Sequence, residues 1–306
     1  MNTRTVSFGY CPFPLEMTSG AITISSLPSI KESFKLVEED AGVDGIWIYA
    51  PPNMRYDYNG STITKPYPNR IFGLPHTHKI SHASSDSDDH LIFHLWVMSF
   101  FTGLRLTSTQ AGYVDSTPIR PHKTFDFFLS EQDLIATLSL AETFWTMHRD
   151  VPERAKLIAA IVHALLLSKN PNHLQFETFL MLYSAFDACF ALAKSVHQFP
   201  KREAPTHAQR ILWMCNLFKI PVPDWTEKSI EMGPDIASIR NETVHEALFM
   251  GEPVGFALHG VGTNTNLTLE MRALVCRLLV ALLGAELADY VISPVNTRQR
   301  QHLKIG

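Results

Sequence analysis

The 306-residue chain has little cysteine, no paired cysteine motif and no excess of positive charge. Its four cysteines are scattered without a Cys-x-x-Cys pair, which favours a reducing compartment. Lysine and arginine total 26 against 30 aspartate and glutamate residues, a formal charge of −4. Strong non-specific phosphate binding needs clustered excess cation, so a globally basic nucleic-acid-binding protein is excluded. A local basic groove is still compatible with this balance.

The chain also lacks an apolar targeting segment at its start and an uninterrupted membrane-spanning run. Residues 1–9 contain no hydrophobic stretch of the kind found in signal peptides. The most apolar late segment, 273–292, is interrupted by Arg277, Glu286 and Asp289, which favours a soluble core helix over a membrane span. We therefore expect a folded, cytoplasmic protein without a membrane partner.

The residue composition and the hydrophobic periodicity differ between two parts of the chain, and this difference predicts an α+β fold with two domains. Residues 1–125 are rich in turn formers, and strand-like runs occur at 20–25 and 44–52. A helix is predicted over 88–103, with acidic residues in its first turn and Gly103 as its stop. The proline- and glycine-rich segments on either side of residue 63 are predicted to be loops. This N-terminal α+β domain matches no family by pattern.

From Ser130 onward the apolar residues recur with a helical period, and Ser130 is a natural N-cap. Because the helical segments are joined by short links, they predict an all-α bundle over 126–306 in which neighbours pack antiparallel. The predicted helices cover residues 130–148, 151–170, 173–199, 206–220, 234–248 and 267–291.

One of these predicted helices, 234–248, carries the polar residues Arg240, Asn241 and His245. At about 100° per residue, Val244 falls on the stripe expected to face the core, and Arg240 falls at its edge. A guanidinium there has to reach a hydrogen-bond acceptor or a water-filled cleft, because burying its charge without a partner is unfavourable. This helical turn is therefore either ordinary polar surface or a functional site.

The arrangement Arg240-x4-His245, with Asn241 directly after the arginine, resembles the HEPN superfamily. It is similar to the motif helix of abortive-infection HEPN proteins, the nearest subgroup being the ApeA-like domains. In architecture the resemblance covers roughly residues 130–295. It implies a HEPN-like helical bundle and a metal-independent endoribonuclease without a cofactor, acting in antiviral defence or as a toxin. Arg240, Asn241 and His245 would then be the catalytic residues.

These residue types suit RNA cleavage because RNA carries its own nucleophile, the 2′-OH. A histidine such as His245 can move a proton near neutral pH, and the fork of donors on Arg240 fits phosphate oxygens. Asn241 could orient His245 or hold the substrate. Because Arg240 and His245 diverge by about 140° around the helix axis, a facing copy of the helix would complete the site. We therefore expect a homodimer through the motif helix.

Two other functions remain open. A HEPN bundle could be a non-catalytic nucleotide-binding or dimerisation module. Alternatively, the segment 76–94 could support a metal-dependent hydrolase, since His90 and His94 lie four residues apart on a predicted helix and could share a zinc ion. His-x3-His also arises by chance in a chain with 14 histidines, so we expect no metal. The candidate ligands of this segment are His76, His78, His82, His90, His94, Asp86, Asp88 and Asp89.

Overall fold

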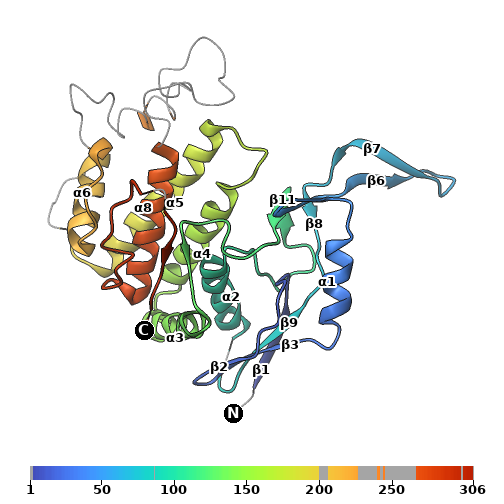
Figure 1. Ribbon diagram of the computed structural model, residues 1–306, viewed down its shortest axis with the longest axis horizontal. Coiled ribbons are helices and arrows are strands. Elements are labelled where there is room, and N and C mark those ends of the chain that lie inside the picture. Colours follow the sequence, from blue (N-terminus) through green and yellow to red (C-terminus); the bar gives the residue numbers. More distant parts are fainter. Residues whose placement is uncertain are drawn as a thin grey trace, which may run out of the picture. The chain divides into compact units, whose positions relative to one another are not determined.

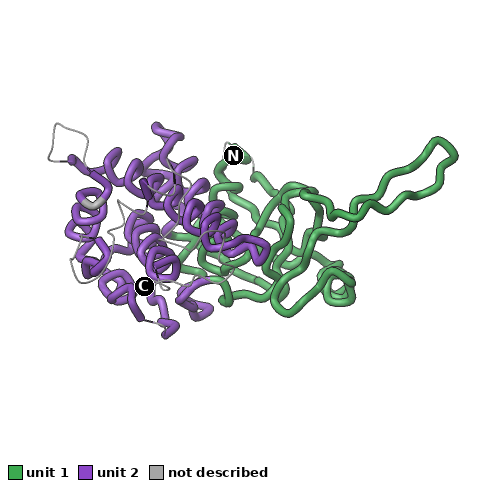
Figure 2. Tube along the Cα trace, turned by 90° about the horizontal axis from the view of Figure 1, so that it is seen from above, with its two compact units in different colours: residues 1–124, 134–139 green, residues 125–133, 140–306 purple. Residues whose placement is uncertain are grey.

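The computed structural model describes residues 3–85, 87–199, 206–226, 240–241, 244, 267–297 and 299–305. The fold is mixed α+β, as the sequence predicted. It divides into two compact units, coloured separately in Figure 2. Unit 1 comprises residues 1–124 and 134–139, and unit 2 comprises residues 125–133 and 140–306. Helix α3, Glu131–His148, contributes residues to both units.

Unit 1 is built on a four-stranded antiparallel sheet in the order β1-β9-β3-β2 (Figure 1). β9 pairs with β1 on one side and with β3 on the other, so that Ile80 lies opposite Val6 and Ile24. His78, Ile80 and His82 are all buried, because alternate residues of a strand point to the same face. The strands are β1 Arg4–Phe8, β2 Met17–Ser19, β3 Ile22–Ser26 and β9 His78–His82.

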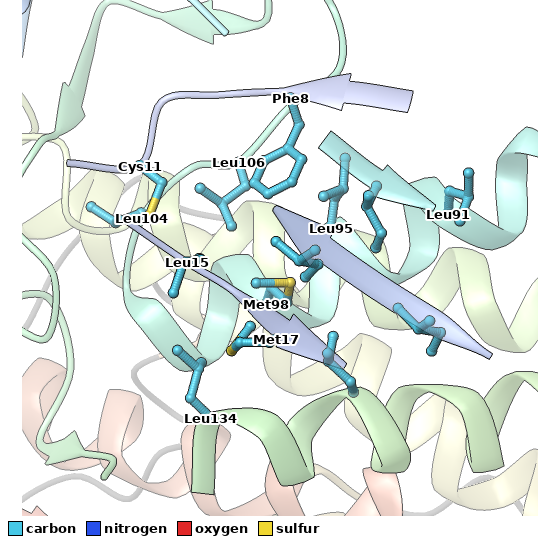
Figure 3. Packing of buried hydrophobic residues seen from close by; sticks show 14 residues of the cluster. Phe8, Cys11, Leu15, Met17, Leu91, Leu95, Met98, Leu104, Leu106 and Leu134 are labelled. Carbon is cyan, nitrogen blue, oxygen red and sulfur yellow. The ribbon is translucent and has the colours of Figure 1, made fainter. Parts of the chain in front are cut away.

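Helix α2, Asp88–Thr102, contacts β1 and β9. The hydroxyl of Ser87 caps its N-terminus by accepting a hydrogen bond from the Asp89 N–H at 3.1 Å. Gly103 ends the helix with φ 69°, a conformation that favours glycine. The predicted helix over 88–103 is thus confirmed. Its apolar side chains join the main core of unit 1 (Figure 3), which includes Phe8, Leu91, Leu95, Met98 and Leu134.

A second, smaller core of unit 1 lies around Tyr10, Val37, Ile48, Phe72 and Tyr113. The surrounding strands form a three-stranded sheet, β11-β5-β4, and the pairs β10-β8 and β6-β7. The elements are α1 Ile30–Glu38, β4 Val43–Asp44, β5 Trp47–Tyr49, β6 Pro52–Tyr56, β7 Thr62–Pro68, β8 Ile71–Phe72, β10 Tyr113–Val114 and β11 Ser116–Pro118.

The hairpin of β6 and β7 extends away from the other strands of unit 1 (Figure 1). The sequence predicted loops here, and that prediction was wrong. The Asp57 carboxylate closes the turn by accepting hydrogen bonds from the N–H groups of Asn59 and Ser61, at 2.9 and 2.8 Å. Gly60 supplies the positive φ of 78° that this turn needs. The prolines in these strands are tolerated because both are edge strands.

Unit 2 is mainly helical in the part of the chain that is described. Ser130 starts α3 in a capping box with Asp133, and Pro152 opens α4. Helix α5 is long and apolar enough to cross a membrane by length and composition, but 50% of that window is buried and the helix packs against α4 and α8. We therefore identify α5 as a core helix. The elements are β12 Phe127–Phe128, α4 Pro152–Leu167, α5 Gln175–Val196, α6 His207–Phe218, η1 Asp224–Thr226, α8 Leu267–Val280, η2 Ala281–Ala285 and β13 Gln301–His302.

Helix α8 is shorter than the sequence predicted. The predicted helix continued to residue 291, whereas α8 ends at Val280 and is followed by one π-helical turn, Ala281–Ala285. Gly284 has φ 109°, which lies outside the helical region and ends the element. The chain then reverses and brings Ser293 back to Arg277.

Arg277 is the centre of a buried polar network in unit 2. Its side chain is fully buried and donates to the Asp126 carboxylate at 3.0 Å, and to the carbonyl oxygens of Ser293 and Pro294 at 2.9 and 3.0 Å. The guanidinium lies 4.4 Å from the ring centroid of Tyr290, whose hydroxyl donates to Asp126 at 2.6 Å. A buried charge satisfied in this way has a structural role.

Candidate functional site

Four polar side chains come together where α5 contacts α6 in unit 2. Tyr183 and Asp187 lie four residues apart on α5 and therefore share one face of it. His207 and Arg210 occupy the first turn of α6, which begins at His207 because the hydroxyl of Thr206 caps the helix.

Two interactions hold these side chains together. The Tyr183 hydroxyl and the Nδ1 atom of His207 form a hydrogen bond, and the two ring centroids are 5.4 Å apart. Arg210 donates from Nη1 to the Asp187 carboxylate at 2.8 Å, and its guanidinium lies 5.1 Å from the ring centroid of Phe190. Because Nδ1 is engaged by Tyr183, Nε2 is the nitrogen through which His207 can meet another molecule.

Burial and two arginines set the protonation of this cluster. Burial lowers the pKa of His207, Arg210 and Arg240 lower it further, and Asp187 opposes them. Burial raises the pKa of Tyr183, Asp187 adds to the rise, and the two arginines oppose it. At pH 7 His207 is therefore neutral and Tyr183 keeps its hydroxyl proton. These are states from which the pair can accept or pass on a proton.

Two residues of the sequence motif, Arg240 and Asn241, are helical. Arg240 is partly buried, and its Nη1 donates to the side-chain oxygen of Asn241 at 3.2 Å. The charge of Arg240 acts on both His207 and Tyr183, so the motif arginine belongs to the neighbourhood of the α5–α6 cluster. Asn241 is exposed.

The other two predictions about the motif helix have different outcomes. His245 lies outside the described residues. Val244 was expected to face the core, and that expectation was wrong, because its side chain is 47% exposed.

The sequence alone did not single out Tyr183, His207 and Arg210. A signal for Tyr183 was present, because Tyr183 and Asp187 put polar groups at a four-residue spacing on an otherwise apolar helix. His207 directly follows a threonine N-cap, which is typical of a helix start and says nothing about chemistry. Their pairing depends on the contact between α5 and α6, which no local pattern predicts.

The histidine-rich segment 76–94 contributes several buried side chains to unit 1. On α2, the ring centroids of His90 and His94 are 5.0 Å apart, and the His82 ring of β9 lies 4.6 Å from that of His90. A ring nitrogen of His82 and one of His90 lie within 4.8 Å of each other. The structure therefore brings three of the five histidines of this segment together.

A local hydrogen bond argues against metal ligation by His82. His82 accepts a hydrogen bond at Nδ1 from the Ser84 N–H at 3.1 Å, so neutral His82 carries its proton on Nε2 and has no lone pair there for a metal. Asp88, a predicted ligand, is exposed and pairs with Arg4 at 2.8 Å. Burial lowers the pKa of His78 to about 4, which keeps that ring neutral in the core.

Elemental analysis of protein purified without a histidine tag tests this interpretation. We expect well under one zinc per chain, because the hydrogen bond to His82 competes with metal ligation. The matched comparison is the His90→Ala/His94→Ala variant, which should have the same low zinc content. One tightly held zinc per wild-type chain, lost in that variant, would instead establish a metal centre.

Comparisons of the chain with protein-family models, with curated proteins and with solved structures found no match.

Proposed function

We propose that the protein is a metal-independent endoribonuclease of the HEPN type, and that the helices of unit 2 are its HEPN-like bundle. The observation that carries this proposal is the effect of Arg240, whose charge lowers the pKa of both His207 and Tyr183. A guanidinium whose charge lowers the pKa of an imidazole can combine phosphate recognition with proton transfer, the two capacities that RNA cleavage needs. A cytoplasmic location and a role in defence against foreign nucleic acid are part of the same proposal.

In the proposed reaction, the 2′-oxygen of a ribose attacks the adjacent phosphorus. A bond forms between O2′ and phosphorus while the bond from phosphorus to O5′ breaks. His245 accepts the 2′-OH proton as the base, the imidazolium so formed donates a proton to the departing O5′, and Arg240 stabilises the negative charge on the phosphorane oxygens. The products are a 2′,3′-cyclic phosphate and a 5′-OH. We assign the motif residues Arg240, Asn241 and His245 to this chemistry.

The proposal includes a homodimer in which two motif helices face each other. Arg240 and His245 diverge by about 140° around one helix, so one copy presents an incomplete site. A two-fold axis beside the helix would bring the residues of one chain toward those of the other, and isologous pairing is the commonest arrangement of soluble oligomers.

The test is an RNA-cleavage assay in the presence of EDTA. Wild-type protein is expected to cleave RNA and to leave 2′,3′-cyclic phosphate ends. The His245→Ala variant is expected to lose cleavage, because a proton-transfer group is removed, and its melting temperature is expected to stay nearly unchanged.

The outcomes separate the alternatives. Unchanged cleavage by His245→Ala would contradict the catalytic assignment. Cleavage abolished by EDTA and restored by zinc would favour the metal-dependent hydrolase. RNA or nucleotide binding without cleavage would favour a non-catalytic HEPN module.

A further inference from the structure

Two cations lie beside the C-terminus of α4 in unit 2. Lys169 directly follows Ser168, the C-cap of α4, and Arg272 is carried by α8. Arg272 is only 8% exposed, and its Nη2 donates to the Ser168 carbonyl oxygen at 3.3 Å. Its Nε is buried and has no hydrogen-bond partner in the described part of the chain. A guanidinium offers five N–H donors, so this one is under-used by the protein itself.

Among the described residues, no carboxylate forms an ion pair with Lys169 or Arg272. The carboxylate whose charge reaches both is Asp126, and it is already bound by Arg277 at 3.0 Å and by the Tyr290 hydroxyl at 2.6 Å. The charge of Asp126 is therefore shared among several groups and cannot neutralise all of them.

The neighbouring thiol supplies no negative charge either. Cys276 lies four residues after Arg272 on α8 and is fully buried. Burial raises the pKa of this thiol well above its ordinary value, and the charge of Asp126 raises it further. The thiol is therefore neutral near pH 7.

The remaining positive charge is energetically unfavourable. Burial lowers the pKa of Lys169 to about 8, and the charges of Arg272 and Arg300 lower it further. The C-terminus of α4 offsets this with about half an elementary negative charge, against two full positive charges. Buried charges are normally paired, and among the described residues no carboxylate is devoted to Lys169 or Arg272.

We infer that Lys169 and Arg272 form a binding site for a small oxyanion with phosphate chemistry. The guanidinium of Arg272 can donate to phosphate oxygens, and the ammonium group of Lys169 adds a second charge. Because Arg272 is almost completely buried, a free phosphate or the terminal phosphate of a nucleotide fits better than a phosphodiester within a strand. This site does not involve the motif residues, so it is independent of the proposed ribonuclease activity.

Phosphate titration at constant ionic strength, with chloride as the reference anion, tests the inference. Wild-type protein should show a saturable rise in melting temperature with inorganic phosphate. NMR of ¹³C-labelled lysine should show the pKa of Lys169 moving upward on phosphate binding, because an anion favours the charged amine. Adenosine 5′-monophosphate and adenosine form the second arm. Tighter binding of the nucleotide than of phosphate identifies a nucleotide end as the ligand, and binding of phosphate alone identifies the free anion.

The Lys169→Met and Arg272→Met variants should bind phosphate at least about tenfold more weakly, since each loses a charge-assisted contact. Lys156→Met, which removes an exposed lysine from α4, is the matched control and should bind as wild type does. Equal responses to phosphate and chloride, or undiminished binding in Lys169→Met, would overturn the inference. If Arg272→Met does not fold, the Lys169→Met variant and the wild-type NMR titration still decide it.

Discussion

Replacing Arg277 with methionine is expected to destabilise unit 2 by about 3–5 kcal/mol, because removing one partner of a buried ion pair leaves the other charge uncompensated. The Asp126 carboxylate would lose its ion pair, and the carbonyl oxygens of Ser293 and Pro294 would lose their donors. Urea unfolding followed by circular dichroism measures the effect. The exposed Arg149→Met variant is the matched control, with an expected change within about 0.5 kcal/mol.

Two further variants separate charge from geometry at Arg277. Arg277→Lys keeps the charge but loses the planar fork of donors, so an intermediate loss is expected. The double variant Arg277→Met/Asp126→Leu removes both charges and should lose less than the sum of the two single variants. Additive losses would contradict a coupled pair, and a wild-type urea midpoint for Arg277→Met would contradict the structural role.

Replacing Arg240 with alanine is expected to reduce RNA cleavage by about a hundred- to a thousandfold, because one charge-stabilising donor at the phosphorane is removed. The melting temperature should change little, because this side chain is only partly buried. The pKa of His207 should rise, since the charge of Arg240 lowers it in the wild-type protein. Kinetics and NMR titration of the His207 ring measure the two effects separately.

Mixing chains tests whether this site is shared between two copies. Arg240→Ala and His245→Ala are each expected to cleave RNA far more slowly than the wild type, and a mixture should recover part of the activity if a heterodimer contains one intact pair. Arg149→Ala is the control and should cleave at the wild-type rate. If Arg240→Ala raises the pKa of His207 but cleaves RNA at the full rate, Arg240 acts on His207 but has no catalytic role. If the pKa of His207 is unchanged in Arg240→Ala, the charge of Arg240 does not act on His207.

Local signals in the sequence were sufficient for several elements. Ser130 with Asp133 marks the start of α3, and Gly103 marks the end of α2, because caps act within one helical turn. The polar turn at Arg240 and Asn241 was also visible, since a guanidinium at the edge of an apolar stripe needs a partner. What that arginine faces was not predictable from its own helix.

The turn chemistry of the β6–β7 hairpin was visible too, in Asp57 and Gly60. It was outweighed by the prolines, which discourage a strand assignment unless the strand is known to lie at an edge. Edge position is a property of the assembled sheet. The length of α8 was also not predicted, because the apolar pattern continues past Gly284 while the helical conformation ends there.

The sequence by itself determined which segments become the main helices, which residues cap them, and that a charged turn occurs at Arg240. The tertiary structure decided which polar side chains from distant segments interact. Asp126 meets Arg277 across 151 residues of chain, Tyr183 meets His207, and Arg272 comes to the end of α4 beside Lys169. Propensity and capping act over a few residues. These pairings instead depend on how apolar faces pack, and many sequences with the same periodicity would pack them differently.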